Sequence, residues 1–263
     1  MTTQHAAARA FAWAGAVLFA AALAYFLFSY SLTFGEITEG TIAPGAIAFD
    51  IALFSLFALH HSIFARIPVR SFVRQIVTEK LERSVYVWVA SLMLIGVCYA
   101  WRAVPGVLWQ VSRPWNWAIV AVQLVAIWLT LRSAAVIDGL DLAGVRQFVK
   151  PKTPGLPQRL GGVAPIPNPK SQNPNPKSQD AAQTMEFKTE GPYGWVRHPI
   201  YLGWILVVFC VGTMTMTRFV FAAISSLYLL IAIPFEERTI RTQSPGYDDY
   251  MRRVPWKLIP RVY

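Results

Sequence analysis

The stretch Gly-Pro-Tyr-Gly-Trp-Val-Arg-His-Pro-Ile-Tyr-Leu-Gly, residues 191–203, lies where a polar, proline-rich segment runs into a long apolar one. Pro199 suits the first turn of a helix, because the N–H that proline lacks would have no partner there. Arg197 and His198 then lie at the start of that helix, where backbone N–H groups and the helix dipole attract anionic groups. The stretch therefore predicts a polar site at a membrane surface.

A pair of glutamates, Glu236 and Glu237, closes the apolar region that follows this stretch. Residues 199–217 and 219–235 are uncharged and are separated by Arg218. Two such runs predict a helical hairpin that crosses the membrane and returns. We therefore expect the two glutamates to lie at a helix end, on the same side of the membrane as the Arg-His pair.

The composition points to an integral membrane protein. Of the 263 residues, 55% are hydrophobic and only 14% are charged, whereas a soluble domain carries about a quarter charged residues. Further apolar runs cover residues 10–35, 40–65, 84–101 and 114–131. Each is close to the roughly 17–25 residues that a spanning helix needs. With the hairpin, these runs predict an all-α integral membrane protein of about six transmembrane helices.

The net charge of +10 reflects basic residues that lie mostly between the apolar runs. With six spans, the basic segments 66–83, 138–190 and 238–263 fall on one side, which the positive-inside rule makes cytoplasmic. Both termini, the Arg197–His198 pair and the Glu236–Glu237 pair are then expected to be cytoplasmic. This pattern favours a lipid bilayer over nucleic acid as the partner of the basic residues, and no obligate protein partner is evident.

The chain divides into three expected parts. Residues 1–137 hold four N-terminal transmembrane helices, residues 138–190 form a cytoplasmic loop, and residues 191–263 form the core with the hairpin and a cytoplasmic tail. Within the loop, the sequence Pro-Asn-Pro-Lys-Ser-Gln occurs twice in tandem, beginning at Pro167 and Pro174. Proline at this density predicts a disordered or polyproline-II linker.

Two more groups of polar residues border the apolar runs. His60 and His61 follow the second run, and Arg83 precedes the third. A histidine near a helix end costs little free energy in a membrane protein. These residues therefore have a structural interpretation beside a functional one. The two cysteines, Cys98 and Cys210, lie inside apolar runs without the spacing of metal ligands, and we expect no metal site.

The ordered set of motifs in the last third of the chain resembles the isoprenylcysteine carboxyl methyltransferase superfamily. These motifs are Arg197-His198-Pro199-x-Tyr201-x-Gly203, Glu236-Glu237-Arg238 and Tyr247-x-x-Tyr250-x-x-x-Val254-Pro255. Upstream motifs are similar to those of the bacterial methanethiol S-methyltransferases, a narrower branch. They are His60-His61-Ser62-x-x-Ala65-Arg66, Glu82-Arg83-Ser84-x-Tyr86-Val87 and Trp101-Arg102.

The resemblance implies S-adenosylmethionine as methyl donor, a small thiol as acceptor (methanethiol giving dimethyl sulfide) and a bacterial inner membrane as location. The residues carried over as cofactor-binding are Tyr193, Arg197, His198, Tyr201, Gly203, Glu236, Glu237 and Arg252. Arg197 or His198 would receive the methionine carboxylate, and a glutamate the ribose hydroxyls or the ammonium group. The catalytic candidates are His61, His60 and Arg83, with His61, then His60, then His198 as the base that takes the thiol proton.

Three alternatives stay open on the sequence. In the first alternative, the methyl acceptor is a prenylcysteine carboxylate or a phospholipid amine instead of a small thiol. Alternatively, the chain is an NADPH-dependent membrane reductase, since sterol-type reductases are similar in their last hairpin. Finally, the fold serves a membrane sensor or assembly factor, because fold alone does not fix function. Binding of S-adenosylmethionine separates the methyltransferases from the other two.

Overall fold

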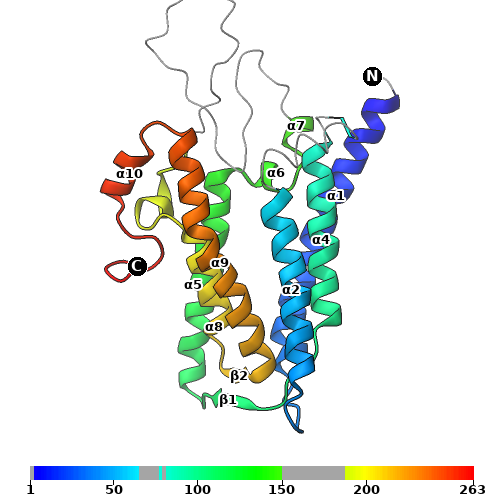
Figure 1. Ribbon diagram of the computed structural model, residues 1–263, viewed down its shortest axis with the longest axis vertical. Helices are drawn as coiled ribbons and strands as arrows, with labels where there is room; N and C mark the ends of the chain where they lie inside the picture. The colour runs from blue at the N-terminus through cyan, green and yellow to red at the C-terminus, as the bar shows by residue number, and fades with distance from the viewer. Residues whose placement is uncertain (1–2, 65–76, 79–80, 150–186) are drawn as a thin grey trace, which may run out of the picture.

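The structure is a computed structural model that describes residues 3–64, 77–78, 81–149 and 187–263. Its helices run roughly along one axis (Figure 1). The elements are α1 (Thr3–Ser31), η1 (Thr33–Gly35), α2 (Pro44–Phe64), α4 (Glu82–Ala100), β1 (Val107–Gln110), α5 (Trp115–Ile137), α6 (Gly139–Leu142), α7 (Arg146–Val149), η2 (Gly191–Gly194), α8 (Pro199–Phe209), β2 (Thr213–Thr215), α9 (Met216–Gln243) and α10 (Tyr247–Arg253). The predicted disorder of the Pro-Asn-Pro-Lys repeat concerns residues outside these ranges.

Within the described ranges, five helices are long and apolar enough to cross a membrane: α1, α2, α4, α5 and α9. The chain is thus a mostly helical integral membrane protein, as predicted. The sixth expected span differs, because α8 has 11 residues, about 16 Å at 1.5 Å per residue. That is about half the thickness of a bilayer's hydrocarbon core. The chain leaves the helix after Phe209 because residues 213–215 pair as a strand.

The last long helix also differs from the expected second arm of the hairpin. Helix α9 begins at Met216, before Arg218, and continues through Pro234 to Gln243. Glu236 and Glu237 therefore lie inside a helix, about two turns before its end. The prediction that they lie at a helix end was wrong, because the polar residues that follow them continue the same helix.

Arg218 connects the first and last long helices. Its side chain is buried and donates hydrogen bonds to the carbonyl oxygens of Tyr30 (2.9 Å), Ser31 (2.6 Å) and Thr213 (2.6 Å). Tyr30 and Ser31 are the last residues of α1, whose final carbonyl groups have no partner within the helix. The guanidinium also complements the negative end of the helix dipole. Arg218, which the sequence presents as the break between two apolar runs, is thus a cap for α1.

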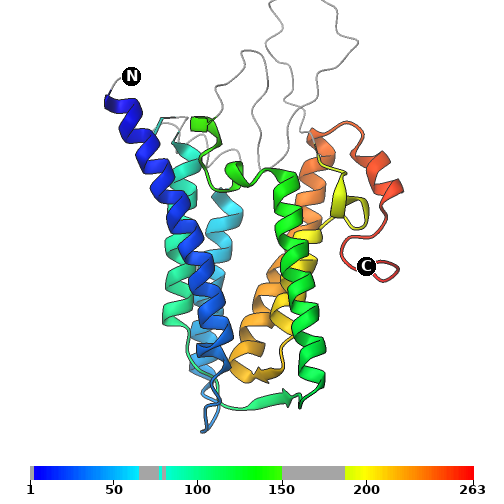
Figure 2. The same ribbon diagram turned by 180° about the vertical axis from the view of Figure 1, so that it is seen from behind.

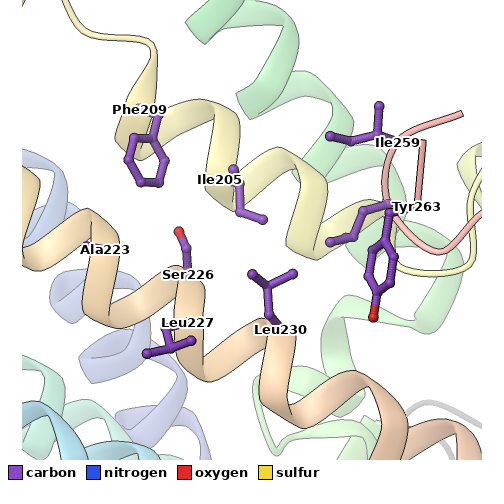
Figure 3. Close-up of a pocket in the computed structure, with 9 residues that line it drawn as sticks. Ile205, Phe209, Ala223, Ser226, Leu227, Leu230, Ile259 and Tyr263 are labelled. Atoms are coloured by element: carbon purple, nitrogen blue, oxygen red, sulfur yellow. The ribbon is translucent and has the colours of Figure 1, made fainter.

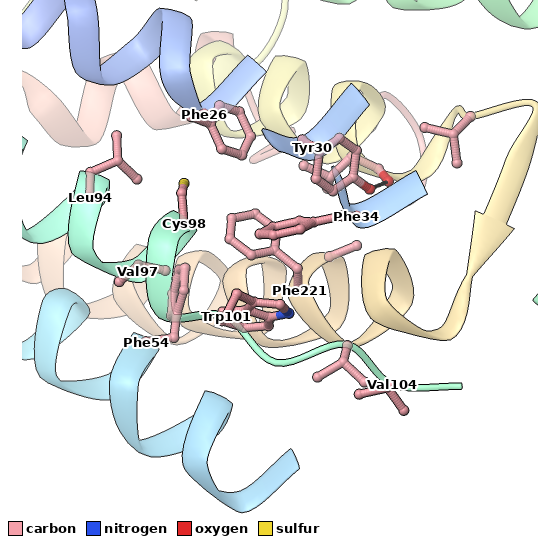
Figure 4. Close-up of a cluster of buried hydrophobic side chains, with 14 of the residues drawn as sticks. Phe26, Tyr30, Phe34, Phe54, Leu94, Val97, Cys98, Trp101, Val104 and Phe221 are labelled. Carbon is pink, nitrogen blue, oxygen red and sulfur yellow. Dashed lines mark hydrogen bonds between the residues drawn. The ribbon is translucent and has the colours of Figure 1, made fainter. Parts of the chain in front are cut away.

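An aromatic core lies near Arg218, around the fully buried Phe221. Six rings have their centroids 5.1–6.2 Å from the Phe221 ring: Phe26, Tyr30, Phe34, Phe54, Trp101 and Trp204. Figure 4 shows the first five of them around Phe221. They come from α1, η1, α2, α8 and the residue after α4, so the core joins elements from the whole chain. Large apolar rings buried together in this way contribute strongly to stability.

The helices form two groups that meet through this core. Helix α1 packs on α4, and α5 packs on α8, while α2 contacts both α4 and α9. Strands β1 and β2 pair antiparallel, with Trp109 opposite Met214, and β1 runs along the base from one group to the other (Figures 1 and 2). This small sheet was not expected in an all-α chain. The N-terminus, α6, α7 and α10 lie toward the opposite end, and which side of the membrane that end faces stays a prediction.

Candidate functional site

The structure brings the Arg-His pair and the second glutamate together. The Arg197 Nε atom lies 2.7 Å from Glu237 Oε1, and His198 Nε2 lies 3.2 Å from the same oxygen. All three residues are buried, since each is at most 8% exposed as a whole. A buried charge is tolerated only when it is paired and hydrogen-bonded. Glu237 is therefore held in place by Arg197 and His198 of the 191–203 stretch.

A second set of contacts ties this cluster to residues 254–263, which we call the tail segment. Arg197 Nη1 donates to the carbonyl oxygens of Val254 (2.8 Å) and Pro255 (2.7 Å). The backbone N–H groups of Arg197 and His198 donate to the carbonyls of Trp256 and Lys257, both at 2.9 Å. Sequence reasoning missed these partners, because a backbone carbonyl carries no residue signature.

Glu236 has a different environment from Glu237. Its carboxylate accepts a hydrogen bond from the Tyr201 hydroxyl and lies 3.7 Å from His198 Nδ1. The side chain of Glu236 is 46% exposed, against 8% for that of Glu237. The rings of His198 and Tyr201 stack with centroids 5.4 Å apart. Glu236 is thus the carboxylate of the pair that an incoming ligand can reach, with a hydroxyl and an imidazole beside it.

Tyr193 borders the same cluster from η2. Its backbone carbonyl accepts a hydrogen bond from the Tyr250 hydroxyl at 2.8 Å. Burial raises the pKa of Tyr193, and nearby Tyr250 and Glu236 raise it further. Burial also raises the pKa of Tyr250 to about 12, although Arg197 acts in the opposite direction. Both phenols therefore stay protonated at neutral pH, and that of Tyr250 acts as a hydrogen-bond donor.

The upstream histidines gather around Tyr86 of helix α4. The Tyr86 hydroxyl lies 2.6 Å from His61 Nδ1, and the His60 ring stacks on Tyr86 with centroids 6.0 Å apart. The Arg83 guanidinium carbon lies 5.3 Å from the centre of the Tyr86 ring, and Arg83 Nε donates to the backbone carbonyl of Asp141 at 3.1 Å. Tyr86 and Asp141 were not among the predicted site residues, although Tyr86 is part of the upstream motif.

The two clusters interact through a pair of tyrosines, one from each. Tyr86 lies close enough to Tyr201 for the two phenols to interact electrostatically, and Tyr201 in turn donates to Glu236. Helix α2, which carries His61, also contacts α9, which carries Glu236. The residues predicted separately for proton transfer and for cofactor binding thus lie in two clusters, and Tyr86 and Tyr201 are the members through which these clusters interact.

Curated relatives match over most of the chain. Methanethiol S-methyltransferase 2 of Bradyrhizobium diazoefficiens is 31% identical over 220 residues, covering 83% of this chain and 74% of the relative. Methanethiol S-methyltransferase of Mycobacterium tuberculosis is 30% identical over 226 residues, covering 80% of this chain and 79% of the relative. The chain belongs to the methanethiol S-methyltransferase family. The resemblance found in its motifs is thereby confirmed.

This methanethiol S-methyltransferase family member is also similar to a eukaryotic protein named Nurim. Nurim of Xenopus laevis is 30% identical over 205 residues, covering 75% of this chain and 64% of that protein. No family model and no solved structure matches the chain. The roles of individual side chains are therefore argued from the geometry of this chain alone.

Gly203 of this family member packs against helix α5. A Cβ atom at Gly203 would lie 2.2 Å from Thr130 Oγ1 and 3.0 Å from the carbonyl oxygen of Ala126. Real Cβ atoms do not approach other atoms this closely, so a side chain would push α8 away from α5. Its presence in the motif is explained by this packing, and the predicted contact of Gly203 with a cofactor receives no support from its position.

We expect Gly203→Ala to destabilise the protein by about 1–3 kcal/mol, the usual effect of overpacking. The double variant Gly203→Ala/Thr130→Ala removes the closest atom and should recover part of the loss. Thermal unfolding of both variants in detergent measures the effect. A Gly203→Ala protein with unchanged stability and lost cofactor binding would instead support the cofactor role.

Arg252 lies outside the cluster in this family member. Its side chain is 75% exposed and pairs with Asp249 on the surface of α10. In contrast, Tyr247 and Tyr250 of the same helix are buried and pack against Phe187. Helix α10 therefore turns its tyrosines toward the protein and Arg252 toward the outside. The role of Arg252 in closing the site stays a prediction without a supporting contact.

Proposed function

We propose that the chain is an integral-membrane methyltransferase that uses S-adenosylmethionine to methylate methanethiol, giving dimethyl sulfide. The observation that carries the proposal is the similarity, at 30–31% identity, to proteins named methanethiol S-methyltransferase. The geometry adds support, because the described residues form a carboxylate–phenol–imidazole cluster around Glu236 and a histidine–phenol pair of His61 and Tyr86.

The residues of the cluster suit S-adenosylmethionine. This donor carries an ammonium group and ribose hydroxyls, which are hydrogen-bond donors, and the exposed carboxylate of Glu236 is an acceptor. Tyr201 and His198, both within reach of Glu236, add further polar contacts. We therefore assign the direct contact to Glu236, Tyr201 and His198. When bound, the donor supplies an electrophilic methyl group on a positively charged sulfur.

Arg197 and Glu237 act as positioning residues in this proposal. The Arg197 side chain donates to Glu237 and to two carbonyls of the tail segment. Glu237 is buried and also contacts His198. Together they fix the start of α8 to α9 and orient the His198 ring. A fixed arrangement of this kind aligns reacting atoms without reorganisation during the reaction.

The thiol must lose its proton before it attacks. We assign the proton to the His61 ring. The Nδ1 atom of this ring lies 2.6 Å from the Tyr86 hydroxyl. Tyr86 orients the imidazole, and Arg83 lies over the Tyr86 ring. The thiolate sulfur then forms a bond to the methyl carbon as that carbon's bond to the sulfonium breaks. Opposite charges disappear in this step, which a low-dielectric, water-poor site favours.

The test is methyl transfer by purified protein with labelled S-adenosylmethionine and methanethiol, followed as dimethyl sulfide in the headspace. We expect product from the wild type and a marked loss in Glu236→Gln, which keeps the shape of the side chain but removes its charge. Binding of S-adenosylmethionine without product would move the acceptor to a prenylcysteine carboxylate or a phospholipid amine. If the protein shows neither binding nor product, the methyltransferase is refuted and the reductase or the sensor remains.

A further inference from the structure

An apolar groove of about 480 Å³ lies between α8, α9 and the tail segment. Figure 3 shows its side chains converging from these three elements. They include Ile205, Phe209, Ser226, Leu230, Leu258 and Tyr263. None of the predicted site residues is among those that line it. The groove is therefore separate from the polar cluster, although the tail segment belongs to both.

The groove is continuous with the lipid-facing surface of α9. Two of its lining residues, Leu227 and Leu230, are 57% and 39% exposed. Ile231 and Phe235, further along the same helix, are also exposed. Because α9 is long and apolar enough to cross a membrane, these side chains meet lipid tails. An acyl chain is thus the molecule that reaches this groove from the bilayer.

Two polar features distinguish the groove from a plain lipid-facing surface. The Ser226 hydroxyl is buried and has no hydrogen-bond partner among the described residues, and in Figure 3 it points into the space between α8 and α9. A buried hydroxyl without a partner is unfavourable, and a lipid ester carbonyl would accept its hydrogen bond. In addition, the Lys257 ammonium lies 3.2 Å from the hydroxyl of Tyr263, a groove residue.

More positive charge lies where a headgroup would be. Arg261 of the tail segment is exposed, and so is Arg238 of α9. Arg238 follows Leu230 by eight residues, which is about 12 Å further along the helix. Basic residues beside an apolar, membrane-facing groove favour an anionic headgroup.

We propose that this groove binds one acyl chain of an anionic phospholipid, whose phosphate contacts Lys257 and Arg261. The lipid is bound there and is not the methyl acceptor. The same tail segment holds Arg197 and His198 through the carbonyls of residues 254–257. Lipid bound in the groove therefore stabilises the tail segment and, through it, the polar cluster. The binding itself does not depend on the proposed methyl transfer.

The test uses the full chain in nanodiscs that contain phosphatidylglycerol with a photoreactive diazirine on the acyl chain. We expect the label on peptides that contain residues 223–230 or 258–263. Leu230→Trp fills the groove and should reduce this labelling to background. The matched control is Leu124→Trp, which adds the same ring at an exposed position of another spanning helix, α5, and should leave it unchanged.

The headgroup is tested separately. Lys257→Ala/Arg261→Ala should lower labelling by about tenfold, the effect of one to two basic residues at an anionic surface. Phosphatidylcholine that carries the same diazirine should label the wild type as weakly as phosphatidylglycerol labels the double variant. Phosphatidylglycerol should raise the thermal stability of the wild type but not that of Leu230→Trp. Labelling of these peptides that is equal in wild type and Leu230→Trp, or equal for the two lipids, would overturn the proposal.

Discussion

Arg197→Ala is expected to abolish methyl transfer and to destabilise the protein by about 3–5 kcal/mol, the effect of removing one partner from a buried ion pair. The variant leaves the Glu237 carboxylate buried without its closest cation, which lies 2.7 Å away in the structure. It also leaves the carbonyls of Val254 and Pro255 without their donor. Thermal unfolding in detergent and dimethyl sulfide formation measure the two effects.

Two further variants show whether the geometry or only the charge matters. Arg197→Lys keeps the charge but has one nitrogen in place of the separate Nε and Nη1 atoms that contact Glu237 and the two carbonyls. We therefore expect partial stability and little activity. Arg252→Ala removes an arginine that is 75% exposed, and exposed ion pairs contribute about 0–1 kcal/mol. We expect Arg252→Ala to resemble the wild type. If it were as damaging as Arg197→Ala, the assignment of roles to the two arginines would be wrong.

His61→Ala is expected to lower kcat for methanethiol by about 10²–10⁴-fold at neutral pH, the usual contribution of a general base. The loss should shrink as the pH rises, because the thiol then ionises without help. Tyr86→Phe keeps the ring that packs on His60 and His61 but removes the hydroxyl 2.6 Å from Nδ1. It should shift the pH–rate profile with a smaller loss. The rate of dimethyl sulfide formation against pH measures both.

The matched control is His5→Ala, which removes the histidine near the start of α1 and should leave the profile unchanged. Binding of S-adenosylmethionine should also be unchanged in His61→Ala, because His61 belongs to the Tyr86 cluster and not to the Glu236 cluster. A His61→Ala protein with a normal rate and a normal pH profile would exclude His61 as the base. His60 and His198 would then be tested in that order.

The spanning helices were predictable because each is an apolar run bounded by polar residues. Residues 10–35 and 114–131, for example, correspond to α1 and α5, and only the ends differ. The length of α8 was not predictable, because its apolar run continues beyond Phe209 into the β2 strand. Apolar composition shows which segments enter a membrane, but pairing with a distant strand decides where a helix stops.

The polar site was predictable in part for a similar reason. Arg197, His198, Glu236 and Glu237 are charged or ionisable residues beside apolar runs, and such residues attract a functional interpretation. The sequence did not separate the two glutamates, because their difference arises from burial and from the tail segment. The role of Tyr86 was not predictable, because tyrosines are common in apolar helices and the sequence does not show that the His61 Nδ1 atom lies 2.6 Å from its hydroxyl.

The hydrogen bonds of Arg218 have a consequence for the order in which the protein assembles. The arginine and the carbonyls of Tyr30 and Ser31 are 188 and 187 residues apart in the chain. Helix α1 is synthesised before α9, and its last carbonyls lack the Arg218 donor until α9 enters the bilayer. Unpaired backbone groups are strongly disfavoured in lipid, so α1 ends near the headgroups or beside water until then. Insertion of α9 thus completes α1, whose end lies 187 residues earlier in the chain, and the bundle cannot close before both helices are in the bilayer.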